Sequence, residues 1–203
     1  LQQDRITKQF SLGGKIYELG MIMADSSINR VVQVARPYVD ALREELNETV
    51  AIEVWSGAST VVAYEAESNR PLRVVAGRLG KTPPVHAAAG ARAILSVAEP
   101  TQIDAAFKGV LHRYTSSTIT DVDILKGNLA QFKEQGFAVD RDELDIGISA
   151  VGAPIFDHQG KAIAAIVVLI PSPRFSDDPK SKTITELKAV SKTISGKFFY
   201  KDD

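Results

Sequence analysis

The chain has 203 residues, of which 44% are hydrophobic and 24% are charged. This balance is typical of one globular domain with a substantial core. Its 24 basic residues are matched by 25 acidic ones, for a formal net charge of −1. The chain therefore lacks the broad positive field with which proteins hold a nucleic acid backbone. The absence of cysteine excludes disulfides, thiolate nucleophiles and thiolate metal sites.

No membrane segment is expected. The longest apolar stretch, residues 146–170, is interrupted by the polar run 157–161 and predicts two strands joined by a turn. The amino terminus lacks a basic region followed by an apolar run, so no signal peptide is expected. We therefore expect a cytoplasmic protein without a membrane partner.

The first half of the chain predicts a helix and three strands. Apolar residues recur every three or four positions over 30–46, which indicates a helix that Pro37 must kink or restart. A shorter linker helix is predicted near 16–23. The period then changes to two, so 50–55 and 61–65 predict a hairpin, and 72–76 predicts a third strand.

The second half predicts helices, then strands, then a closing helix. The predicted ranges are 87–97, 100–111 and 122–135 for helices, 137–139, 146–156 and 162–170 for strands, and 183–199 for the last helix. Gly136 is a suitable carboxyl-terminal cap for the helix at 122–135. Hairpins on both sides of a helical insertion favour an α+β fold with an antiparallel sheet flanked by helices.

The motifs of common enzymes are absent. Gly147 and Ser149 begin a nucleophile-elbow pattern, but the second glycine is missing. The three histidines are far apart in the sequence and lack the spacing of metal ligands. No glycine-rich phosphate loop is present. We expect no catalytic residues, no metal and no cofactor.

Several short strings occur in order along the chain: LREELNETVAIE (42–53), PLR (71–73), GKTPPVHAAAGARAIL (80–95), RYTSSTIT (113–120), GFAVDRDELDIG (136–147) and APIFD (153–157) with Gly160. In their order and separations they resemble the effector-binding domain of the isocitrate lyase regulator (IclR) family. Asn47 departs from the family pattern, because glycine is usual there. The resemblance covers the chain from about Leu12 to its end, and residues 10–20 look like the end of the family's winged helix-turn-helix domain and the start of its linker helix.

The resemblance implies a GAF-like fold with a six-stranded antiparallel sheet. Residues 1–12 would be the remnant of the wing, 13–28 the linker helix, and 29–203 the effector-binding domain. Such proteins form homodimers or homotetramers and bind a small metabolite. We expect a repressor whose operator DNA is bound through a winged helix-turn-helix domain outside this chain.

The resemblance also implies an effector site. The main chain at Ala89 and Gly90 would contact the effector, Asp140 would make a polar contact, and Leu72, Val75 and Pro83 would line the pocket. From strand alternation, Ile148 with Ala150 and Val167 with Leu169 could line one wall. Alternatives remain: residues 87–89 could simply pack on the sheet, Asp140 could be a solvated turn residue, and the apolar residues could be core.

The expected effector is weakly polar. Val167 and Leu169 stand where relatives that bind small polar acids can carry hydroxyl groups, and a buried carboxylate needs several donors. We therefore predict a weakly polar or aromatic acid, a lactone or a short semialdehyde.

Two other functions remain open. A GAF-like sensor domain of another signalling protein is distinguished by the sequence that precedes Leu1. An enzyme on a similar sheet would reveal itself by turnover of a bound metabolite.

Overall fold

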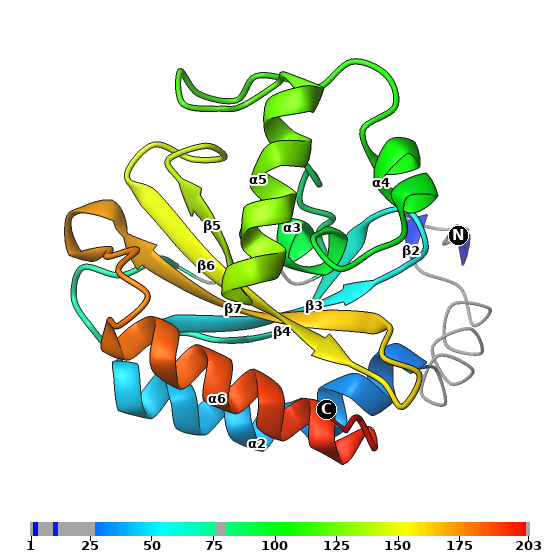
Figure 1. Cartoon of the computed structure of the whole chain (residues 1–203). Coiled ribbons are helices and arrows are strands. Elements are labelled where there is room, and N and C mark those ends of the chain that lie inside the picture. Colours follow the sequence, from blue (N-terminus) through cyan, green and yellow to red (C-terminus); the bar gives the residue numbers. More distant parts are fainter. Residues whose placement is uncertain (1, 4–9, 12–26, 76–79, 202–203) are drawn as a thin grey trace.

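The computed structural model describes residues 2–3, 10–11, 27–75 and 80–201 (Figure 1). In chain order its elements are β1 (Gln2–Gln3), β2 (Phe10–Ser11), α2 (Ser27–Leu46), β3 (Thr49–Trp55), β4 (Thr60–Ala66), α3 (Ala89–Leu95), α4 (Pro100–Ala106), α5 (Val122–Gln135), β5 (Ala138–Arg141), β6 (Ile148–Phe156), β7 (Ala162–Pro171), the 3-10 helix η1 (Ser172–Arg174) and α6 (Lys182–Lys197).

A five-stranded antiparallel sheet in the order β4-β3-β7-β6-β5 forms the centre of the described structure. Figure 1 shows α2 and α6 on one face of this sheet and α3, α4 and α5 on the other. Strand β7 is buried along almost its whole length, as expected for a strand covered on both faces. The predicted α+β fold with an antiparallel sheet is confirmed.

Helix α2 buries the apolar face that the sequence predicts. Val31, Ala35, Val39 and Leu42 are each at most 3% exposed, and the helix contacts β3, β4 and α6. It begins at Ser27, earlier than predicted, and it runs through Pro37 without restarting. The predicted helix near 16–23 lies outside the described residues, and the domain boundaries stay predictions.

Helix α5 has the predicted range and has clear signals at both ends. The Asp121 carboxylate accepts hydrogen bonds from the main-chain N–H groups of Asp123 (2.9 Å) and Ile124 (3.1 Å). Gly136 ends the helix in the left-handed conformation, with φ of 79°. Glycine and asparagine adopt this conformation more readily than other residues do. These local signals explain why the sequence alone was sufficient to predict the range of α5.

Replacing the α5 cap, Asp121→Ala, is expected to lower the free energy of unfolding by about 1 kcal/mol, because two N–H groups of the first turn lose their acceptor. Urea denaturation followed by circular dichroism measures the loss. Asp121→Ser keeps an acceptor and should stay within a few tenths of a kcal/mol of the parent chain. Equal stability of the alanine and serine variants would contradict this role.

The strand predicted at 72–76 is not formed in its described part, residues 72–75. Among the described residues the central sheet therefore has five strands and not the six that the resemblance implies. Side chains from elsewhere donate hydrogen bonds to two carbonyl groups of this segment. Thr49 Oγ1 donates to the Val74 carbonyl (2.6 Å), and Arg174 donates to the Leu72 carbonyl (2.9 Å). The β4 edge is instead bonded at Val62 by residues 80 and 81.

None of the helices in the described parts of the chain is both long and apolar enough to cross a membrane.

Candidate functional site

A small enclosed space lies between the amino-terminal end of α3 and the face of the sheet that α3 covers. We call it the α3 pocket. Its volume is about 20 Å³. All five strands of the central sheet, the segment before α3 and the β5–β6 loop contribute side chains to it. The described residues that line it are Ala51, Glu53, Val62, Glu65, Pro83, Ala88, Ala89, Asp140, Leu144, Ala150, Val167 and Leu169.

Most of the effector-site residues expected from the sequence meet here. The sheet register explains why, since Asp140 lies opposite Ala150, and Ala150 lies opposite Leu169. Directly paired residues of antiparallel strands point to the same face. Six of the expected residues therefore line the α3 pocket: Pro83, Ala89, Asp140, Ala150, Val167 and Leu169.

Gly90 lies at the edge of the α3 pocket and is tightly packed. A Cβ atom at Gly90 would lie 2.4 Å from Oε2 of Glu53 and 2.8 Å from Cγ2 of Val167. Only a residue without a side chain lets α3 lie so close to these two strands. The position that the resemblance assigns to effector contact is thus next to the carboxylate of Glu53.

The other expected residues do not line the α3 pocket. Leu72 and Val75 are 64% and 65% exposed, on the segment that does not form a strand. Ile148 shares the strand face of Ala150, but it is half-buried at the start of β6, opposite Pro171 at the end of β7. The structure therefore separates these three residues from the pocket.

Six lining residues were not expected from the sequence. Two of them, Ala51 and Glu53, share one face of β3 because they are two positions apart. Glu65 pairs with Ala51, and Val62 pairs with Glu53, so β4 adds its side chains to the same face. A glutamate within the apolar strand 49–55 was the available signal for this wall. Ala88 and Leu144 lie in connecting segments and carry no such signal.

The two most buried carboxylates of the pocket are held by hydrogen bonds. Glu53 is 6% exposed, and its Oε2 accepts a hydrogen bond from Thr60 Oγ1 (3.0 Å). Asp140 is 4% exposed, and its Oδ1 accepts a hydrogen bond from the main-chain N–H of Glu143 (2.8 Å). The interpretation of Asp140 as a solvated turn residue is therefore wrong.

A buried ion pair anchors α3 beside the pocket. Arg92 of α3 is 1% exposed and donates to both carboxylate oxygens of Glu143, at 2.7 and 3.0 Å. It also donates to the Val139 carbonyl and lies over the Phe132 ring. The main-chain carbonyl of Glu143 accepts a hydrogen bond from Thr118 Oγ1 (2.6 Å). Glu143 thus connects α3 to Asp140 of β5 and to the 113–120 loop.

The α3 pocket is closed in this structure. About 20 Å³ is room for one water molecule, which needs roughly 10–15 Å³, whereas small-molecule pockets usually measure about 300–1,000 Å³. A metabolite therefore fits this space only if residues that line it move apart.

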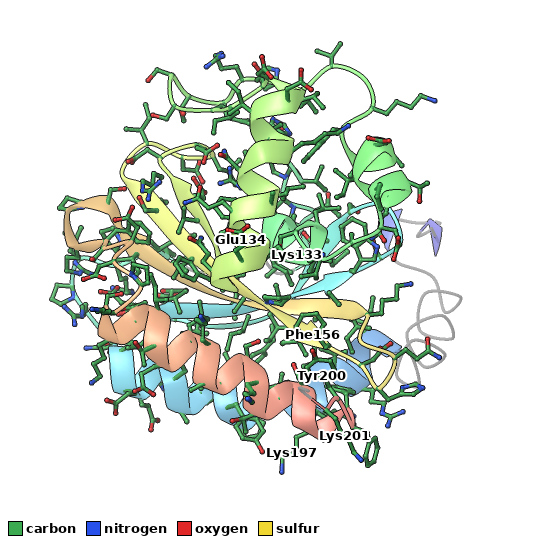
Figure 2. All side chains as sticks on the ribbon, in the orientation of Figure 1. Lys133, Glu134, Phe156, Lys197, Tyr200 and Lys201 are labelled. Atoms are coloured by element: carbon green, nitrogen blue, oxygen red, sulfur yellow. The ribbon has the colours of Figure 1, made fainter. Side chains whose placement is uncertain are left out.

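Larger cavities lie elsewhere. One of about 660 Å³ is lined by Trp55, Phe198 and Phe199, among others. Another, of about 410 Å³, lies between α5 and α6 and is lined by Lys133, Phe156 and Tyr200, among others. Figure 2 shows Lys133 at the carboxyl end of α5 and the Phe156 and Tyr200 rings near the end of α6; these rings stack with centroids 4.8 Å apart. Neither cavity is lined by a buried charged side chain.

Across the described ranges, no three or more His, Cys, Asp or Glu side chains come together in a group that could hold a metal ion.

Comparison with known proteins shows the family. The family described as "Bacterial transcriptional regulator IclR C-terminal" matches residues 25–196. The chain belongs to the IclR family. The members and relatives are transcriptional regulators and not enzymes.

Among the relatives, the HTH-type transcriptional repressor AllR of Salmonella paratyphi A is 32% identical over 149 residues, which cover 73% of this chain and 54% of that protein. The chain thus spans about half the length of AllR. The crystal structure of Thermotoga maritima IclR has a TM-score of 0.82 at 26% identity, covering 98% of this chain and 79% of that one.

An IclR homolog from Microbacterium hydrocarbonoxydans, solved in complex with 4-hydroxybenzoate, also shares the fold. Its TM-score is 0.82 at 21% identity, covering 96% of this chain and 78% of that one.

Proposed function

We propose that this chain is the effector-sensing part of an IclR-type repressor and that a small metabolite binds in the α3 pocket. The observation that carries the proposal is the meeting of Glu53 and Asp140, both almost fully buried, between the start of α3 and the face of the antiparallel sheet that α3 covers. Small side chains at Ala88, Ala89 and Ala150 leave space there once α3 withdraws.

The fold type, the linker, DNA binding and the oligomeric state are proposed by analogy with the family. We propose that the fold is GAF-like, that residues 13–28 link the sensing domain to a winged helix-turn-helix domain, and that the preceding residues 1–12 belong to its wing. Operator DNA would be bound by that domain, in the cytoplasm, by a homodimer or homotetramer. The AllR relative is a repressor, and the Microbacterium relative holds a small aromatic molecule, which supports a repressor with a small effector.

The closed pocket suggests how sensing works. A ligand that fits only an open pocket binds one conformation better and shifts the population toward it. The ion pair between Arg92 and Glu143 holds α3 in place. Movement of α3 to open the pocket must therefore disturb the 113–120 loop or the β5–β6 loop. If the same shift alters operator affinity, operator DNA must alter effector affinity by the same factor.

Filling the pocket tests the proposal. Ala150 is 4% exposed, and Ala150→Val adds two methyl groups where there is room for one water. The parent chain is screened against a panel of small amines, alcohols, lactones and carboxylic acids. We expect the compounds that stabilise the parent chain to lose this effect in Ala150→Val. At 100 times its dissociation constant, a ligand contributes about 2.7 kcal/mol, or a rise of roughly 5–10 °C in Tm for a chain of this size.

Differential scanning fluorimetry measures these shifts. Ala130→Val, on an exposed position of α5, is the matched control and should keep the full response. Equal ligand-induced shifts in Ala150→Val and in the parent chain would place binding elsewhere and contradict the proposal.

A further inference from the structure

A polar cavity lies beside β5, the edge strand of the central sheet, and we call it the α5–β5 cavity. Its volume is about 250 Å³, a little below the usual range for small-molecule sites, about 300–1,000 Å³. Gln131 of α5 and Arg141 of β5 line the cavity, and both residues are exposed. The cavity is therefore open to solvent and has room for a small ligand.

The α5–β5 cavity is separate from the α3 pocket. Among the described residues, none lines both spaces. Alternation along β5 explains the separation, because Asp140 faces the α3 pocket, while its neighbours Val139 and Arg141 face the other way and line the α5–β5 cavity. A ligand in the α5–β5 cavity therefore does not compete directly for the space of one in the α3 pocket.

The charged groups of the α5–β5 cavity are paired with one another. Its described lining contains two arginines and two acids. Arg92 donates two hydrogen bonds to Glu143, and Arg141 forms an ion pair with Asp177. Because these charges cancel, an ionic ligand would lose hydration without gaining a net counter-charge. The cavity therefore favours a neutral ligand.

Three side-chain amides of α5 supply hydrogen-bonding groups to the cavity. Asn128, Gln131 and Gln135 are three or four positions apart, so they lie on one side of the helix. Gln135 donates from Nε2 to the Phe137 carbonyl (2.7 Å). Within the described ranges, the amides of Asn128 and Gln131 take part in no hydrogen bond. Each of these amides offers both N–H donors and a carbonyl acceptor to a ligand.

Arg92 adds a donor that the fold leaves unused. Its side chain is 1% exposed and makes three hydrogen bonds, to Glu143 and to the Val139 carbonyl. Its Nε atom is buried without a hydrogen-bond partner among the described residues. A buried N–H group without an acceptor is unfavourable, and a ligand carbonyl can supply the acceptor. Because Arg92 belongs to α3, such a ligand also contacts the helix that covers the α3 pocket.

We infer that the α5–β5 cavity is a second ligand site, for a small neutral molecule that carries an amide group beside an apolar part. An amide matches the side chains of Asn128 and Gln131, because its carbonyl accepts hydrogen bonds and its N–H groups donate them. The apolar part packs against Phe132 and Phe137, which also line the cavity. The inference goes beyond the proposed function and does not depend on it.

Probes of matched size test the class of ligand. Benzamide, benzoate and benzylamine share one ring and are neutral, negative and positive at neutral pH. Isothermal titration calorimetry on the full chain should give benzamide at least about tenfold higher affinity than either ion. Equal affinities, tighter binding of benzoate or benzylamine, or no binding of benzamide at millimolar concentration would overturn the inference.

A double variant of α5 locates the bound amide. Asn128→Ala combined with Gln131→Ala removes both amides and keeps good helix formers, so it should fold and should weaken benzamide binding at least about tenfold. Gln33→Ala removes the same group from an exposed position of α2, on the opposite face of the sheet (Figure 1), and should leave the affinity unchanged. An unchanged affinity in the double variant would overturn the inference.

The same titration separates the two spaces. Benzamide binding that persists in Ala150→Val, where the α3 pocket is filled, and is weakened in the α5 double variant is the result expected of a second site. Benzamide binding that Ala150→Val abolishes would place the amide in the α3 pocket and overturn the inference, while the proposed effector site would stand.

Discussion

Replacing Glu143 with alanine is expected to lower the free energy of unfolding by about 3–5 kcal/mol, because it leaves a buried guanidinium without its counter-charge. Arg92 is 1% exposed and directs two hydrogen bonds to the Glu143 carboxylate. Its Nε atom is buried without a hydrogen-bond partner, so Arg92 depends strongly on the bonds that remain. Urea denaturation measures the change.

Two further variants separate the charge effect from general damage. Adding Arg92→Met to Glu143→Ala should recover part of the lost stability, because the uncompensated charge is then gone. Asp104→Ala breaks a similarly short ion pair, to Lys126 at 2.6 Å, between exposed side chains, and should leave the urea midpoint unchanged. A loss below about 1 kcal/mol in Glu143→Ala would show that the buried pair does not hold α3 in place.

Gly152→Ala is expected to destabilise the fold by about 1–3 kcal/mol, because a single methyl group cannot be accommodated. A Cβ atom there would lie 2.9 Å from the Ala89 carbonyl oxygen and 3.1 Å from the Gly90 Cα. Both contacts are with the backbone at the start of α3, so the helix would have to move away from β6. The same movement would widen the α3 pocket and raise the affinity for its ligand.

The matched control, Gly127→Ala, is expected to change the stability of the chain in the opposite direction. Gly127 lies within α5, and a Cβ atom there would have no neighbour within 4 Å. Gly127→Ala should therefore stabilise the chain by about 0.5–1 kcal/mol through its helix propensity. Thermal and urea unfolding of the two variants give the comparison. A neutral Gly152→Ala would mean that α3 is not packed against β6 as the structure shows.

Elements with local signals could be predicted from the sequence. Helix α5 is bounded by a capping Asp121 and by Gly136, and these signals do not depend on the rest of the fold. The strands β6 and β7 were visible because both faces of the sheet are buried there. The segment 72–75 also contains apolar residues, at Leu72, Val74 and Val75. Thr49 and Arg174, which are distant in the sequence, donate to two of its carbonyl groups, and no local pattern reveals that.

The pocket could be predicted only in part. Strand alternation placed Ala150, Val167 and Leu169 on common faces, but it could not identify which face of β3 joins them. Glu53 was therefore missed, although a glutamate in a buried strand is unusual. The closure of the pocket depends on how closely α3 approaches the sheet at Gly90 and Gly152, and such distances follow from tertiary packing.

The most direct test of effector binding at the α3 pocket is a crystal structure of the chain with, as the probe, the member of the small-molecule panel that stabilises the chain most. We expect the probe between the start of α3 and the sheet, in contact with Glu53 and Asp140, with the pocket enlarged well beyond about 20 Å³. Binding instead in the cavity between α5 and α6, beside Lys133 and Tyr200, with the α3 pocket unchanged, would contradict the account.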